Sequence, residues 1–223
     1  MEKITYYFFN FELIQPYLPQ LWSGFLLTLA MAVSTVVTGI ALGLVLAIIR
    51  AYQVKAINAL IVVFIDVFRA IPQLVVIVVV YFALPAINIT LSPVIATIAG
   101  LSLILAAFSE EIFWGGLGAI ARGQWEAARS TGMSFSQALA YVILPQVLRN
   151  SIAPLTNRAI GITKGTALGS VIAVPELLNV ASSVQSTIAN PTPMMVSAVL
   201  FCLIFLPFVR LTRWLETRFN PVR

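Results

Sequence analysis

Residues 126–132 read Glu-Ala-Ala-Arg-Ser-Thr-Gly, and the tripeptide Ile-Leu-Pro follows at 143–145. This polar segment carries basic residues at its flanks and stands between long hydrophobic runs of the chain. Charged residues are costly in the hydrocarbon core of a bilayer, whereas Lys and Arg are common in the loops beside it. We therefore expect residues 122–149 to lie along one surface of a membrane.

The same segment predicts two short helices joined by a bend. Good helix formers occupy residues 125–131, and Gly132 suits the left-handed residue that ends a helix. Ser134 and Gln137 have the spacing of a capping box, which would open a second helix running to Pro145.

The first of these helices offers a surface for a partner. Ala127 and Ala128 would allow a partner to approach the backbone closely, and Glu126 supplies one charge that can pair with a basic group. An ordinary amphipathic surface helix is the alternative interpretation of these three residues.

Composition places the whole chain in a membrane. Of its 223 residues, 60% are hydrophobic and 9% are charged, and the mean hydropathy is +0.99. Soluble domains carry about 25% charged residues. A membrane-spanning helix needs about 20 apolar residues, so the chain has room for about five spans. With no His and a single Cys, Cys202, the sequence offers neither an internal disulfide nor a metal-ligand cluster.

Short polar breaks separate the apolar runs. We predict an all-α membrane protein with about five transmembrane helices, built as one domain over residues 1–223. The second predicted span is interrupted by Pro72, because proline removes a helical hydrogen bond. The predicted spans cover residues 21–49, 56–84, 93–120, 150–174 and 194–211.

The basic residues predict the orientation. One side of the predicted spans has Lys3 alone. The other side collects Arg50, Lys55, Arg122, Arg129, Arg149, Arg210, Arg213, Arg218 and Arg223. Because cytoplasmic loops carry the excess of Lys and Arg, we expect the N-terminus outside and both the C-terminus and residues 122–149 in the cytoplasm. The excess of basic residues behind the net charge of +5 is explained by this orientation in the membrane, and no nucleic-acid partner is expected.

The order Glu-Ala-Ala, then Gly132, then Ile-Leu-Pro resembles the cytoplasmic coupling loop of the permease subunits of ABC importers. Other segments resemble the branch of this family that imports polar amino acids of the histidine, glutamine, arginine and glutamate type. These segments are Phe68–Gln73, Tyr81–Pro85, Ala107–Phe113 and Lys164–Leu168. The resemblance extends from Gly24 to Arg213.

The resemblance implies a type I ABC importer permease fold in a bacterial inner membrane, in a chain that is not itself an enzyme. One set of residues would couple the permease to separate ABC ATPase subunits: Glu126, Ala127, Ala128, Gly132 and Pro145. Those subunits would bind ATP and Mg²⁺, because this sequence has no Gly-rich phosphate loop and is expected to hold no cofactor. Further implied partners are a second permease subunit, in a homodimer or heterodimer, an extracytoplasmic solute-binding protein, membrane lipid and the amino-acid substrate.

Several ionisable residues fall inside the predicted spans, where each costs about 2.5–3.5 kcal/mol unless it pairs or faces water. They are Asp66, Arg69, Glu110, Glu111, Arg158 and Lys164. Asp66 and Arg69 have the spacing of an ion pair on one helix face. Glu111 shares a face with small residues and is expected to point into the protein, as a pathway residue or in a buried salt bridge. Lys164 would either neutralise Glu111 or hold a substrate carboxylate.

The predicted substrate pathway consists of Arg69, Glu110, Glu111, Trp114, Lys164 and Thr166. Trp114 stands where the resembling family usually has Arg, Glu110 where it has a small polar residue, and Gly165 where it has Asp. The net change is one charge toward negative, which favours a neutral or basic amino acid, or an amino-acid derivative, over an acidic one. Trp114 would offer the substrate a cation–π face worth about 0.5–2 kcal/mol. Alternatively, Trp114 only packs and the binding protein alone sets specificity.

Two other classes of function fit parts of the sequence. An ion-coupled secondary carrier, or another small-solute transporter, would explain carboxylates within the membrane but would have no use for a coupling loop. An intramembrane enzyme would need a nucleophile with a base, or a metal site, and neither set of catalytic residues is evident.

Overall fold

A computed structural model of the chain describes residues 6–219, with residues 212, 213 and 215–219 described by their backbone alone. Lys3 and Arg223, which entered the predicted orientation, lie outside the described residues. Over the described range the chain is helical and has no strand. Its α-helices are α2 (Phe11–Ile14), α3 (Leu18–Ala51), α4 (Lys55–Ala70), α5 (Gln73–Ala83), α6 (Pro93–Ala119), α7 (Arg122–Ser130), α8 (Phe135–Ala138), α9 (Leu144–Thr163), α10 (Leu177–Ile188) and α11 (Thr192–Phe219). Shorter 3₁₀ segments are η1 (Gln15–Tyr17), η2 (Leu84–Ile87) and η4 (Lys164–Ile172), and η3 (Leu139–Ile143) is π-helical.

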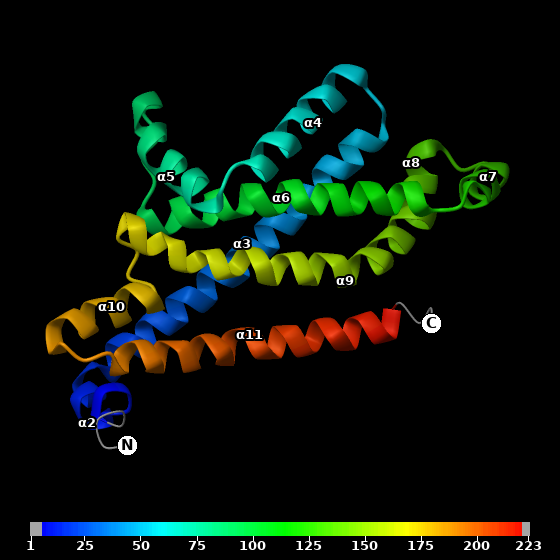
Figure 1. Cartoon of the computed structure of the whole chain (residues 1–223). Helices are drawn as coiled ribbons and strands as arrows, with labels where there is room; N and C mark the ends of the chain where they lie inside the picture. The colour runs from blue at the N-terminus through cyan, green and yellow to red at the C-terminus, as the bar shows by residue number, and fades with distance from the viewer. Residues whose placement is uncertain (1–5, 220–223) are drawn as a thin grey trace.

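Helix α6 forms the centre of the bundle, since it packs against α3, α4, α5 and α9. In Figure 1, α6 and α9 run side by side and α3 crosses behind them, while α11 lies along the other side of α9. Helices α7 and α8 stand at the end of the bundle where α6 stops, and α10 lies toward the opposite end. The C-terminal end of α11 is at the same end as α7, and α2 is at the opposite end.

Glycines let α3 and α6 approach closely where they cross. A Cβ atom added to Gly43 would lie 2.8 Å from the carbonyl oxygen of Ala106 and 2.9 Å from the backbone nitrogen of Glu110. Ordinary contacts between such atoms are roughly 3.5–4.0 Å, so no side chain fits there. The backbones of the two helices therefore touch, and this contact places Glu110 directly against α3.

The helices have room for between three spans and the five that the sequence predicts. Among the described residues, three helical stretches are long and apolar enough to cross a membrane: Tyr6–Ala51, Pro93–Ala119 and Thr192–Leu211. Two further stretches are bent. One joins Lys55–Ala70 to Gln73–Ile87, and the other joins Phe135–Ile172 to Leu177–Ile188. The number of spans rises to five if each bent stretch is counted as one span.

The predicted interruption of the second span at Pro72 is confirmed. Helix α4 ends at Ala70, Ile71 is extended with ψ of 134°, and α5 starts at Gln73. The chain direction bends by 111° between the two helical segments. Proline disfavours the helical conformation in the residue before it, which accounts for the extended Ile71 and for the bend.

One predicted boundary is wrong. The helix that begins after Ser134 does not stop at Pro145 but continues through the π-helical turn η3 into α9. Pro145 lies in the first turn of α9, where proline is tolerated. The fourth predicted span, 150–174, accordingly begins earlier than expected, and it changes from α-helix to 3₁₀-helix at Lys164.

Candidate functional site

The bend between α7 and α8 has the predicted geometry. Gly132 has a φ of +88°, in the left-handed region, and its N–H donates to the carbonyl of Arg129 at 3.0 Å. The backbone N–H of Ser134 donates to Gln137 Oε1 at 2.8 Å, and the N–H of Gln137 donates to Ser134 Oγ at 3.3 Å, which completes the capping box. Two short helices therefore stand at one end of the bundle, joined by a defined turn.

The candidate coupling residues differ in accessibility. Glu126 and Ala127 are exposed on α7, and Pro145 is exposed at the start of α9. Ala128 is only 6% exposed, so the prediction that both alanines face a partner is wrong for Ala128. Ala128 lies on the side of α7 that packs against the rest of the chain, whereas Ala127, about 100° away around the helix, faces solvent.

Aromatic contacts hold α7 and α8, the candidate coupling helices, against the end of α3. The Trp125 ring stacks on the Phe135 ring with centroids 5.3 Å apart and 13° between the planes. Tyr52, which follows α3, meets Phe135 edge-on at 5.4 Å, and its hydroxyl lies 3.1 Å from Ser136 Oγ. The position of α7 therefore depends on the position of the end of α3.

A hollow of about 480 Å³ opens between the coupling helices and the ends of α3 and α6. Its walls are the side chains of Ala51, Gln53, Trp114, Leu117, Gly118, Arg122, Trp125, Glu126 and Phe135. Trp114, a predicted pathway residue, thus lies on the side of the coupling loop and shares this hollow with Glu126.

Glu110, which we expected to line a substrate cavity, is fully buried. Arg50 Nη1 donates to Glu110 Oε1 at 3.0 Å and to Oε2 at 3.2 Å. The Cζ atom of Arg50 lies 4.3 Å from the centroid of the Trp114 ring. The carboxylate of Glu110 and the cation–π face of Trp114 are therefore occupied by an arginine of the chain itself, which corrects the charge argument for the substrate.

The neighbouring carboxylate, Glu111, points the other way. Arg69 Nη1 donates to Glu111 Oε1 at 2.6 Å, and the two side chains keep 36% and 49% of their surface exposed. The predicted pair of Asp66 with Arg69 is wrong because Glu111 is the partner of Arg69. The prediction that Glu111 points into the protein is also wrong, because its side chain is 49% exposed whereas the preceding residue, Glu110, is buried.

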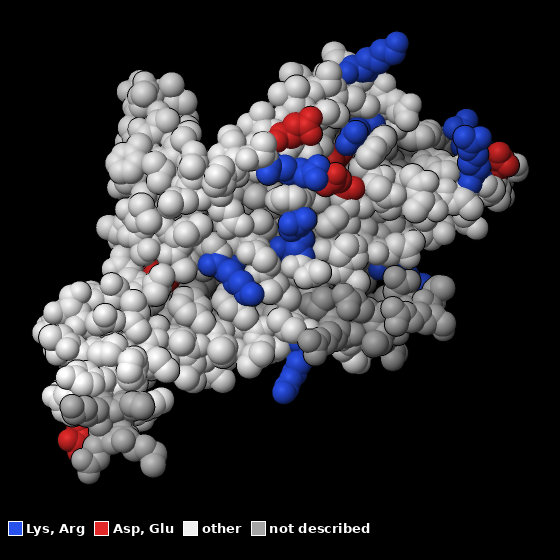
Figure 2. Space-filling model, viewed as in Figure 1, with Lys and Arg blue, Asp and Glu red and all other residues white. Residues whose placement is uncertain are grey.

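Exposed charges gather on one face of the bundle. Figure 2 shows basic and acidic side chains over α4, α6 and α9 on the face in view. The guanidinium carbon of Arg158, on α9, lies 3.8 Å from the centroid of the Phe108 ring, and that of Arg69 lies 5.4 Å from the same ring. Two guanidinium groups thus lie beside one aromatic ring, and one of them, that of Arg69, binds the carboxylate of Glu111. We call Arg69, Phe108, Glu111 and Arg158 the charged face.

The remaining predicted pathway residues, Lys164 and Thr166, have partners outside the charged face. The Lys164 ammonium is 5.9 Å from the centroid of the Phe205 ring on α11, so Lys164 does not neutralise Glu111. Thr166 is buried, and its hydroxyl donates to the carbonyl of Thr163 at 2.9 Å.

Gly165 has a packing explanation. A Cβ atom at this position would collide with the side-chain amide of Gln73 on α5. Aspartate, which the resembling family usually has there, would require the Gln73 side chain to adopt another position.

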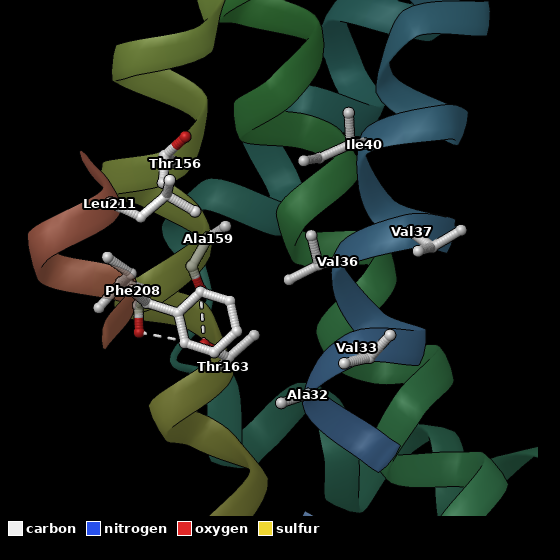
Figure 3. A pocket seen from close by; sticks show the side chains of 11 residues that line it. Ala32, Val33, Val36, Val37, Ile40, Thr156, Ala159, Thr163, Phe208 and Leu211 are labelled. Atoms are coloured by element: carbon white, nitrogen blue, oxygen red, sulfur yellow. Dashed lines mark hydrogen bonds between the residues drawn. The ribbon is translucent and has the colours of Figure 1, made fainter. Parts of the chain in front are cut away.

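A separate groove of about 280 Å³ lies between α3, α9 and α11 (Figure 3). The hydroxyls of Thr156 and Thr163 donate to carbonyls of their own helix, those of Ile152 at 2.7 Å and Ala159 at 2.8 Å. The other residues of the wall are Ala32, Val33, Val36, Val37, Ile40, Ala159, Ile160, Phe208 and Leu211. This apolar groove suits hydrocarbon rather than a polar solute.

The geometry agrees with a comparison against known protein families. The family model described as "Binding-protein-dependent transport system inner membrane component" matches residues 39–221, which include the coupling helices and the charged face. The chain belongs to this family. It is therefore a permease subunit of a bacterial ABC importer in the inner membrane, and the ATPase that drives this permease is a separate subunit. Membership sets aside the secondary carrier and the intramembrane enzyme.

Relatives of the permease are amino-acid transporters. The chain is 37% identical over 176 residues to the probable glutamine ABC transporter permease protein GlnP of Bacillus subtilis, covering 79% of this chain and 81% of that protein. It is 33% identical over 170 residues to the L-cystine transport system permease protein TcyB of the same organism, covering 76% of this chain and 73% of that protein. The crystal structure of an amino acid ABC transporter with histidines has a TM-score of 0.81 at 31% identity, over 91% of this chain and 95% of that chain. The permease thus has the type I ABC importer fold and belongs to the amino-acid branch.

Proposed function

We propose that this permease carries a zwitterionic polar amino acid across the inner membrane and is driven by ATPase subunits that dock on residues 122–149. The observation that carries the proposal is the pair α7 and α8, which presents Glu126 and Ala127 to solvent at one end of the spans. ATP and Mg²⁺ are bound by the ATPase subunits. An extracytoplasmic solute-binding protein delivers the amino acid at the opposite end.

The charged face supports pairing with a second permease subunit. Arg69, Glu111 and Arg158 are exposed on helices of the membrane domain. Exposed to lipid, each charge would cost about 2.5–3.5 kcal/mol. A second permease, identical or related, that covers this face would enclose the charges in a water-filled path between the two subunits.

The charges of this face support a zwitterionic substrate. Arg158 stacks on Phe108 and leaves its N–H groups able to donate to the α-carboxylate of an amino acid. Glu111 offers a carboxylate oxygen to the α-ammonium group. Because Arg50 neutralises Glu110, the surplus of negative charge inferred from the sequence is absent here. We therefore favour a neutral polar side chain over a charged one.

The orientation of the chain is tested with topology reporters, and the function depends on it. The loop between η2 and α6, at Ile89, and helix α7 lie at opposite ends of α6, which spans about 40 Å with its 27 residues. A reporter active only in the cytoplasm is expected to be active when fused after Arg223 and silent when placed at Ile89. The reverse pattern would put α7 outside the cell, where no ATPase reaches it, and would overturn the proposed function.

A further inference from the structure

Arg50, Glu110 and Trp114 form a buried cluster that joins two spans beside the coupling helices. Glu110 comes from the C-terminal half of α6 and Arg50 from the last turn of α3. The side chain of Glu110 is 0% exposed and that of Arg50 is 19% exposed. Both oxygens of the carboxylate accept from the guanidinium, whose carbon lies over the Trp114 ring. We call these three residues the clamp.

Stability alone gives little reason for this arrangement. Replacing a buried ion pair with apolar residues of similar size often leaves stability unchanged or improves it. Directional hydrogen bonds and a stacked ring do supply one thing that apolar contacts lack, which is a single defined position of one helix against the other.

The clamp also has contacts on both of its sides. The backbone carbonyl of Arg50 accepts from Asn58 Nδ2 at 3.2 Å, which ties the start of α4 to the end of α3. Trp114 lines the hollow that it shares with Trp125 and Glu126 of α7. The ends of three helices of the membrane domain are thereby connected next to the coupling helices.

Glu111 follows Glu110 directly in α6, so a shift of the clamp moves the charged face. We propose that Arg50, Glu110 and Trp114 are positioning residues, which keep the ends of α3, α4 and α6 together so that a movement of α7 reaches Glu111 instead of being absorbed between helices. This inference rests on the proposed function for the source of the movement. The geometry that it requires belongs to this chain alone and is measurable without an ATPase.

Distances between spin labels test the geometry on the full chain in lipid nanodiscs. With Cys202→Ser as background, Val54→Cys and Gly123→Cys place labels at the start of α4 and on α7. Val54 is exposed, and a Cβ atom at Gly123 would meet nothing within 4 Å. The parent is expected to give one narrow distance distribution and Glu110→Gln a broad one. Glu12→Gln, which removes the same charge at an exposed site on α2, should match the parent. An equally narrow distribution in Glu110→Gln would overturn the inference.

Amino-acid-stimulated ATP hydrolysis by the complete importer tests the consequence. In Glu110→Gln the stimulation is expected to fall by about 5-fold or more, the lower end of typical coupling between sites. A second variant, Arg50→Met with Glu110→Leu, fills the space of the ion pair with apolar side chains but has no directional hydrogen bonds. This importer should assemble at normal levels, and its ATP hydrolysis should still respond weakly to the amino acid. Full stimulation of this apolar pair would show that the clamp only fills space and would contradict the proposal. If no ATPase associates with the parent, the proposed function fails while the distance experiment still decides on the clamp.

Discussion

Replacing Gly132 by valine is expected to reduce ATP-driven amino-acid uptake by about 10-fold, because the turn between α7 and α8 requires a left-handed residue. At a φ of +88° a non-glycine residue costs about 1–2 kcal/mol, and about 1.4 kcal/mol corresponds to a factor of ten. A Cβ atom at this position would meet no atom within 4 Å, so the loss would come from the changed angle between the helices and not from a clash at Cβ.

Asparagine provides the matched control for this experiment. It enters the left-handed region more readily than other residues, so Gly132→Asn should keep most of the uptake. Uptake is measured in membrane vesicles that contain equal amounts of each permease, as determined by immunoblot. Equal uptake by the valine variant and the parent would mean that the orientation of α7 does not matter for coupling.

Replacing Arg158 by glutamine is expected to lower the uptake of all amino-acid substrates, since the α-carboxylate is common to them. A hydrogen bond to a charged group contributes about 1.5–3 kcal/mol, which corresponds to roughly a 10- to 150-fold loss. Radiolabelled glutamine, arginine and glutamate, each measured alone and in competition, give the ranking of substrates.

Two further variants separate charge from packing at this site. Arg158→Lys keeps the charge but loses the planar stacking on Phe108, so an intermediate loss is expected. Glu111→Gln should shift the ranking toward glutamate, because it leaves Arg69 without its carboxylate partner. Unchanged uptake in Arg158→Gln would exclude this face as the carboxylate site, and a parent that prefers glutamate would contradict the charge argument.

Much of the fold could be predicted because local physics determines it. Runs of apolar residues had to be spans, Pro72 had to break its helix, and Gly132 had to end one. The capping box formed by Ser134 and Gln137 follows from local spacing alone. None of these features depends on how distant parts of the chain pack together.

The ion pairs could not be predicted in the same way. Arg50 resembled a loop residue because it follows an apolar run and counts toward the cytoplasmic charge, but α3 continues through it to Ala51. Its guanidinium reaches Glu110 only because Gly43 brings the two backbones into contact. Arg69 likewise pairs with Glu111, a carboxylate 42 residues away in the sequence, and not with Asp66 on its own helix. The sequence does carry one signal, since two adjacent carboxylates in one span point about 100° apart and so meet different surroundings.

The ATP turnover of the purified complex tests the central claim most directly. The tagged wild-type permease is isolated from its native membrane, reconstituted in vesicles and supplied with the solute-binding protein and a series of amino acids. The account predicts that an ATPase copurifies, that a polar amino acid accelerates ATP hydrolysis, and that this amino acid accumulates in the vesicles only while ATP is hydrolysed. Accumulation by a permease that has no ATPase bound would contradict the account.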